Sequence, residues 1–115
     1  MNKAWTIKYW ITESGKNEIE NWFNKLTDEQ SKSVTKELFI LKKSGNNLKL
    51  PHSRTLGKKL FELRERTYGY RIYYTFHKNQ IIVLLTAGNK STQQNDITKA
   101  RKRIEELKMR QEDFL

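Results

Sequence analysis

The chain has 115 residues, of which 36% are hydrophobic, so it fits one small domain with its own core. Its 23 lysines and arginines outnumber 13 acidic residues, which gives a net charge of +10, a sequence pI near 9.9 and an expected polyanionic partner. The absence of cysteine excludes disulfides and thiolate chemistry, and the lack of a signal peptide or a membrane-length apolar run predicts a cytoplasmic protein.

The N-terminal third predicts one strand followed by two helices. Apolar residues alternate over residues 5–11, as in a strand. A first helix follows with Ser14 as its expected N-cap, and apolar residues recur along it at helical spacing. Thr27 and Gln30 have the spacing of a capping box and begin a second helix, which Gly45 is expected to end. We therefore expect two short antiparallel helices.

The remaining chain predicts three strands and a last helix. Residues 46–59 lack periodicity and are predicted to form an ordered loop. A hairpin over residues 60–76 follows, and the apolar run 81–87 is typical of a strand buried on both faces. Asn95 is expected to cap the last helix, whose non-core face is basic, and residues 109–115 to form a flexible tail. The predicted order is β-α-α-β-β-β-α, an α+β fold in a single domain over residues 1–115.

The hairpin is predicted to have one apolar face and one charged face. A four-residue loop, 67–70, would set Arg66 opposite Arg71 and Arg64 opposite Tyr73. Like charges that face each other across a ladder repel, so an anion is expected to compensate them. The alternative is that the arginines are solvated or paired with Glu62 and Glu65. The predicted charged face consists of Glu62, Arg64, Arg66, Arg71 and Tyr73.

The charge surplus is concentrated around this hairpin. Residues 42–71 hold nine lysines or arginines and two acids. Cations for phosphates and rings on which unpaired bases stack are what an RNA-binding surface needs, although ribosomal and DNA-associated proteins show the same composition. The candidate RNA-binding residues are Arg54, Lys58, Lys59, Arg66, Tyr68 and Tyr73.

Common catalytic templates are missing, and this directs attention to cation-rich chemistry. There is no Gly-rich phosphate loop, no H-E-x-x-H and no cluster with metal-ligand spacing, so no cofactor or metal is predicted. Metal-independent RNA cleavage uses the 2′-hydroxyl as nucleophile and needs charge stabilisation, a proton acceptor and a proton donor. Arginine suits the first role because its planar fork binds two phosphate oxygens.

Four sequence segments resemble the HigB-type toxins, including the phage-derived branch of the RelE/ParE superfamily. They are L-P-H-S-R-T-L-G-K-K-L-F-E-L-R at 50–64, G-Y-R-I-Y-Y at 69–74, G-N-K at 88–90 and K-A-R-K-R-I at 99–104. The resemblance implies a RelE-like fold, with two N-terminal helices packed on a twisted, mainly antiparallel sheet and a C-terminal helix. It also implies ribosome-dependent mRNA cleavage in the A site. The implied partners are the ribosome, its mRNA and a HigA-like helix-turn-helix antitoxin, through which the complex would bind operator DNA.

The resemblance assigns roles to five residues. Arg64 and Arg71 match the family's strand-borne phosphate-binding cations, and Lys90 matches the basic residue after the last strand. His52 matches a histidine that some HigB members place beside the site. The hypothesis is that the two arginines neutralise the scissile phosphate and that Lys90 assists them or protonates the leaving 5′-oxygen. His52 or Glu62 would then remove the 2′ proton.

Two departures from RelE leave the proton-transfer groups open. Glu62 stands where RelE relatives have a lysine, and Gln93, Gln94 or Asp96 falls near the position of a RelE tyrosine. Two other functions also stay open. One is a ParE-like inhibitor that binds a protein target, and the other is a non-catalytic RNA-binding or ribosome-associated protein.

Overall fold

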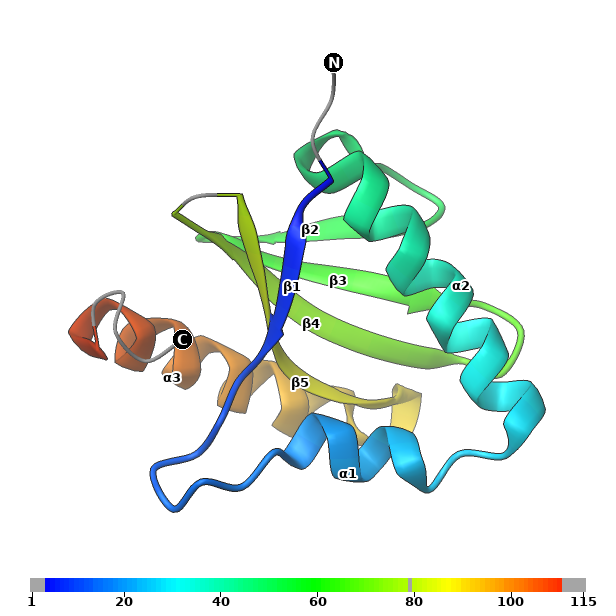
Figure 1. Cartoon of the computed structure of the whole chain (residues 1–115), viewed down its shortest axis with the longest axis horizontal. Helices are drawn as coiled ribbons and strands as arrows, with labels where there is room; N and C mark the ends of the chain where they lie inside the picture. The colour runs from blue at the N-terminus through cyan, green and yellow to red at the C-terminus, as the bar shows by residue number, and fades with distance from the viewer. Residues whose placement is uncertain (1–3, 79, 111–115) are drawn as a thin grey trace.

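A five-stranded sheet with helices on both faces forms the molecule. The computed structural model describes residues 4–78 and 80–110. Strand order is β1-β5-β4-β3-β2, antiparallel except where β1 runs parallel to β5 (Figure 1). This confirms the predicted α+β class. The elements are β1 (Thr6–Tyr9), α1 (Glu18–Asn24), α2 (Asp28–Ser44), η1 (Gly45–Asn47), β2 (Ser53–Gly57), β3 (Leu60–Glu65), β4 (Tyr70–His77), β5 (Ile81–Asn89), η2 (Lys90–Thr92) and α3 (Gln93–Arg110).

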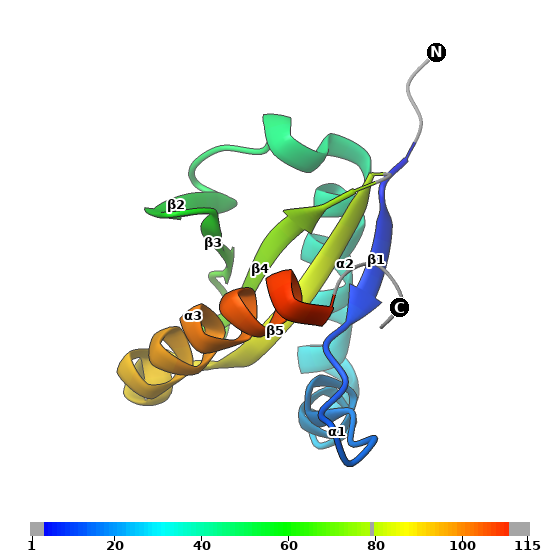
Figure 2. The same cartoon turned by 90° about the vertical axis from the view of Figure 1, so that its left-hand side faces the viewer.

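The two long helices lie on opposite sides of the sheet (Figure 2). Ser33 of α2 donates a hydrogen bond to Glu65 of β3, whereas Gln93 of α3 donates one to Glu62 of the same strand. Since strand side chains alternate between faces, α2 covers one face and α3 the other. Apolar residues of both helices are buried against the sheet, among them Val34 and Leu41 of α2 and Ala100, Ile104 and Leu107 of α3.

The segment 46–59 is not only a loop, and this corrects the sequence prediction. Residues 53–57 form β2, the edge strand, which pairs with β3 so that Arg54 lies opposite Glu62. Edge strands are short and partly polar because one side of the ladder faces solvent. The sequence S-R-T-L-G therefore shows little of the periodicity by which a buried strand is recognised.

The hairpin keeps its predicted faces but not its predicted register. Arg64 lies opposite Arg71 and Glu62 opposite Tyr73, with the four-residue loop at 66–69. The register differs from the prediction by two residues, and a shift of two leaves every side chain on the same face. Arg66 moves from the charged face of the strand into the exposed turn.

Glu65 fixes the position of the turn. Its buried carboxylate accepts hydrogen bonds from the backbone N–H groups of Thr67, at 2.9 Å, and Tyr68, at 3.0 Å, and from the Ser33 hydroxyl, at 2.6 Å. Burial alone would raise the pKa of Glu65, but these hydrogen bonds outweigh it and hold the pKa below its ordinary value. Gly69 supplies the positive φ, +83°, that completes the turn.

Helix starts were predicted correctly in one case of three. The capping box at Thr27 is present in full. The cap of α1 is Asn17 rather than Ser14, because the Asn17 side chain accepts the Glu20 N–H at 3.0 Å. α3 begins directly after η2, and the cap of that short helix is Asn89 instead of the predicted Asn95.

The basic face of α3 is not all surface. Arg103 is buried, and it donates hydrogen bonds to the Leu85 carbonyl, at 2.7 Å, and to Glu18, at 2.6 Å. Leu85 has no partner in β4, because the register between β4 and β5 shifts between Tyr73 and Tyr74, so this guanidinium satisfies a backbone carbonyl at the irregularity. Arg110 lies over the ring of Trp10, with 3.9 Å from its guanidinium carbon to the centroid.

The C-terminal tail was predicted to begin at residue 109. Residues 109 and 110 belong instead to α3, and residues 111–115 lie outside the described part of the chain. No helix in the described ranges is both long and apolar enough to cross a bilayer.

Candidate functional site

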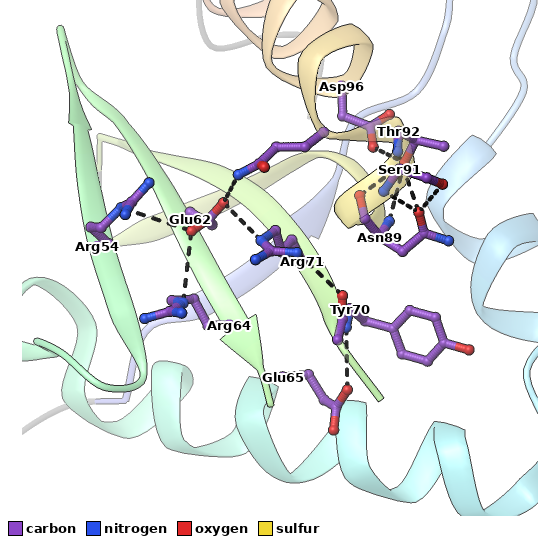
Figure 3. Close-up of polar contacts among 12 residues, drawn as sticks. Arg54, Glu62, Arg64, Glu65, Tyr70, Arg71, Asn89, Ser91, Thr92 and Asp96 are labelled. Atoms are coloured by element: carbon purple, nitrogen blue, oxygen red, sulfur yellow. Dashed lines mark hydrogen bonds and ion pairs between the residues drawn. The ribbon is translucent and has the colours of Figure 1, made fainter. Parts of the chain in front are cut away.

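A buried carboxylate lies among three arginines on the α3 side of the sheet. Glu62 is 1% exposed. Its oxygens lie 3.3 Å from Nε of Arg71, 3.9 Å from Nε of Arg64 and 4.0 Å from Nε of Arg54 (Figure 3). The arginines come from β4, β3 and β2, so three neighbouring strands contribute to one cluster, which we call the arginine cluster.

Strand register explains why these groups meet. Glu62 pairs with Arg54 on one side and with Tyr73 on the other, while Arg64 pairs with Arg71. Directly opposite residues share a face, and positions two apart on a strand also share it. The internal anion that compensates the facing arginines is therefore Glu62. Glu65 was the other predicted partner, but its carboxylate binds the turn.

Gln93 holds the carboxylate from the helix side. Its Nε2 donates a hydrogen bond of 3.0 Å to Oε2 of Glu62, the same oxygen that lies nearest Arg71. Gln93 is the first residue of α3, and it was noted in the sequence only as a neighbour of a missing tyrosine. Nothing in the local pattern distinguishes it from Gln94, because the bond depends on how α3 crosses the sheet.

Positive charge remains after Glu62 is counted. Three guanidiniums against one carboxylate leave two net positive charges, and the side-chain exposure rises from 18% at Arg71 to 33% at Arg64 and 51% at Arg54. An open hollow of about 270 Å³ adjoins the cluster, lined by Arg64, Glu65, Arg66, Gly69, Tyr70 and Arg71. Guanidinium groups that are partly exposed beside a hollow suit a phosphate, which accepts paired N–H bonds.

Tyr73 is fully buried, so its ring has no free face on which an RNA base could stack. This corrects its predicted role. Burial raises the pKa of Tyr73 strongly, and the negative charges of Glu62 and Asp96 raise it further, against the opposing effect of Arg71. The hydroxyl finds no hydrogen-bond partner within the described residues. Tyr73 is thus a neutral phenol beneath the cluster.

Asp96 extends this buried polar region toward α3. Burial raises the pKa of Asp96, while a hydrogen bond from Thr92, at 2.6 Å, and the charge of Lys99 oppose the rise. The backbone of β5 passes close by, since a Cβ on Gly88 would overlap the side chains of Asp96 and Thr92. Gly88 therefore allows α3 to start against the sheet.

His52 lies beside β3, but its ring is turned toward α2. Nδ1 of His52 is 3.0 Å from Oε1 of Glu37 in α2, while its carbonyl accepts the N–H of Arg64 at 2.8 Å. No bond or ion pair joins the imidazole to Glu62 or the arginines within the described residues. The structure thus places the backbone of His52, but not its ring, next to the arginine cluster.

The other predicted site residues are exposed and lie at the ends of the strands. Lys90 follows β5, whose last residue, Asn89, pairs with Tyr70 beside the β3–β4 turn. Arg66 and Tyr68 lie in the β3–β4 turn, and the Tyr68 ring stacks on Tyr70 with 6.2 Å between centroids. Lys58 and Lys59 occupy the β2–β3 turn at the other end of β3. No three His, Asp or Glu side chains gather as a metal site over residues 4–78 and 80–110.

Solved structures identify the fold as that of the RelE toxins. An arginine-to-alanine double mutant of the E. coli toxin RelE in the free state aligns with a TM-score of 0.66 and 14% identity, covering 89% of this chain and 99% of RelE. The intact E. coli RelBE toxin–antitoxin complex gives 0.58 at 15% identity, covering 75% and 96%. The RelE–RelB complex of Pyrococcus horikoshii gives 0.53 at 15% identity, covering 76% and 97%.

Sequence comparison assigns the chain to a family, which is narrower than the shared fold. Residues 21–105 match the family of phage-derived Gp49-like proteins (DUF891), and the chain belongs to this family. An uncharacterized protein of Haemophilus influenzae is 29% identical over 90 residues, which cover 77% of this chain and 88% of that protein.

Proposed function

We propose that this Gp49-like protein is a HigB-type toxin of a type II toxin–antitoxin system that cleaves translated mRNA in the ribosomal A site. The observation that carries the proposal is the arginine cluster, in which Arg54, Arg64 and Arg71 surround the buried Glu62 and keep two net positive charges. The RelE fold supports the same class of activity, but at 14–16% identity it does not assign it.

The reaction is attack of a ribose 2′-oxygen on the adjacent phosphorus, with loss of the 5′-oxygen of the next nucleotide. The products are a 2′,3′-cyclic phosphate and a 5′-hydroxyl. Charge builds up on the non-bridging oxygens in the phosphorane, and Arg71 and Arg64 are the groups that stabilise it. Lys90, exposed beyond β5, protonates the leaving oxygen or assists the arginines.

Glu62 is the proposed proton acceptor. Of the two candidates it is the one in contact with the phosphate-binding arginines, whereas the His52 ring contacts Glu37 of α2. Glu62 is covered in the free protein, so the arginines must turn toward the RNA phosphate before the 2′-hydroxyl reaches it. The hydrogen bond from Gln93 keeps the carboxylate in place as its cationic partners leave.

A cognate antitoxin is the proposed protein partner. Two of the structures with the same fold are toxin–antitoxin complexes, of E. coli and of P. horikoshii. The HigA-like helix-turn-helix type follows from the sequence resemblance, as does binding of operator DNA through the antitoxin. The ribosome and its mRNA, in the cytoplasm, are the remaining proposed partners.

Mapping of mRNA ends after induced expression tests the proposal. The wild-type protein is expected to produce cuts within translated codons that carry a 5′-hydroxyl on the downstream fragment. Arg71→Ala should abolish the cuts, because it removes one of the two cations that stabilise the phosphorane. Growth arrest without cuts would favour a ParE-like inhibitor. Steeply salt-dependent RNA binding without cuts or arrest would favour a non-catalytic RNA-binding protein.

A further inference from the structure

The turn between β2 and β3 has a backbone conformation that its residues do not favour. Gly57 pairs with Leu60, so Lys58 and Lys59 form a two-residue hairpin loop. Both lysines have positive φ, +50° and +69°. This is the arrangement of a type I′ turn, in which Asn-Gly is strongly preferred because a Cβ is strained at positive φ.

Neighbouring elements hold this strained turn in place. Arg101 of α3 donates hydrogen bonds to the carbonyls of Leu56, at 2.8 Å, and Gly57, at 3.3 Å, just before the loop. The Thr75 hydroxyl of β4 donates one to the Lys59 carbonyl, at 2.7 Å. Backbone strain persists only where the surroundings impose it, and it concentrates at functional sites. Two elements here fix a loop whose own residues disfavour it.

The side chains at this turn are cations that point into solvent. Lys58 and Lys59 are exposed, and neither makes an ion pair within the described residues. A cavity of about 540 Å³ lies beside the turn, and its described lining includes Lys59, Lys78 and Lys108, of which Lys108 pairs with Glu105 at 3.2 Å. The field at this end of the hairpin is therefore positive and favours a polyanion.

The turn is too far from the two arginines proposed to hold the scissile phosphate to share that phosphate with them. Along β3, Arg64 lies four positions beyond Leu60, about 13 Å at the usual rise of a strand. An RNA bound at the cluster would have to continue beyond the scissile phosphate to reach the lysines, or a second RNA strand would have to lie here.

We propose that Lys58 and Lys59 form a second RNA-binding point, at which the strained turn presents two cations to a sugar-phosphate backbone away from the scissile phosphate. The choice of RNA as the ligand rests on the proposed function. The backbone belongs either to the message or to ribosomal RNA, since both have the same chemistry.

The test uses a substitution that should change stability and binding in opposite directions. Lys58→Asn combined with Lys59→Gly gives the turn its preferred residues, so the melting temperature should rise by roughly 5 °C. Binding to a short 2′-O-methylated single-stranded RNA and to ribosomes is then measured against salt concentration. For the RNA strand the slope of log K against log salt should become shallower, its magnitude falling by about 1.4, because two phosphate contacts are lost.

Two matched variants serve as controls. Lys58→Arg with Lys59→Arg keeps both charges and should restore the wild-type slope. Lys32→Gln with Lys36→Gln removes the same charge from exposed positions of α2, on the other face of the sheet, and should leave the slope unchanged.

The outcomes separate this inference from the proposed function. A reduced slope for the free strand assigns the contact to the message, and one for ribosomes alone assigns it to ribosomal RNA. Wild-type slopes with both probes would overturn the inference, and an unchanged melting temperature would overturn the argument from strain. The 2′-O-methylated probe cannot be cleaved, so a failure to cut mRNA would refute the nuclease and leave the binding result intact.

Discussion

Replacing Glu62 with glutamine separates its two roles, as a counterion for the arginine cluster and as a proton acceptor. The substitution preserves the shape of the side chain and an oxygen that can accept the bond from Gln93, 3.0 Å away. It removes the only carboxylate that contacts Arg54, Arg64 and Arg71 within the described residues. The net charge of the cluster then rises from two to three.

Glu62→Gln should impair cleavage without weakening RNA binding. A positioned general base contributes about 10²- to 10⁴-fold, so cleavage of translated mRNA should decrease by that factor. Binding of an uncleavable RNA should be as strong as in the wild type or stronger, because the arginines no longer have to leave a carboxylate. The arginine side chains are 18–51% exposed and stay hydrated, so the loss of folding stability should be about 1–2 kcal/mol.

The assay is primer extension on mRNA from a reconstituted translation reaction, with filter binding of the 2′-O-methylated RNA in parallel. Glu105→Gln is the control, since the one ion pair of this exposed acid within the described residues is with Lys108 on the same helix. A Glu62→Gln protein that cleaves at the wild-type rate would refute the assignment. If His52→Gln instead removed cleavage and kept binding, the base would be His52.

Three further substitutions test the surroundings of the site. The pKa of Glu65 is held below its usual 4.5, so the stabilisation that its carboxylate gives the fold is full above that pH and is lost as the pH falls through the lowered value. The melting temperature of the wild type should therefore fall more between pH 6 and pH 3 than that of Glu65→Gln. Equal decreases in the two proteins would contradict this. Gly88→Ala places a methyl group against Asp96, so both the melting temperature and mRNA cleavage should decrease, and an unchanged cleavage rate would show that the start of α3 does not position the site. Arg103→Met leaves a carbonyl of β5 unpaired and should lower the free energy of unfolding by about 2–4 kcal/mol in urea titrations. Lys102→Met, at an exposed neighbouring position, should change it little. Equal effects would refute the role of Arg103 in satisfying this carbonyl.

The hairpin shows which features could be predicted from the sequence. Its two faces were predicted correctly, because side chains alternate with a period of two and a shift of two residues preserves that alternation. The register itself was wrong. It depends on the carboxylate of Glu65, which binds the backbone of the turn, and a glutamate at a strand end has no pattern that indicates such a bond.

Long-range contacts account for the other errors. Lys102 and Arg103 are adjacent cations that look alike in the sequence, although Lys102 is exposed and Arg103 is buried. The difference arises because the register between β4 and β5 shifts at Leu85 and leaves its carbonyl to be satisfied by α3. Arg54 likewise reaches Glu62 only because residues 53–57 add a strand to the sheet, and their polar sequence did not predict one.

The buried glutamate at the centre of the arginine cluster also indicates what the cluster is for. Arg64 and Arg71 face each other directly across the ladder, an arrangement that is unfavourable unless an anion compensates it. Glu62 supplies one negative charge, which holds the arginines close together before any ligand arrives but cannot neutralise all three. The remaining charge faces an open hollow of about 270 Å³, which favours a surface arranged in advance for a phosphate over a solvated strand face.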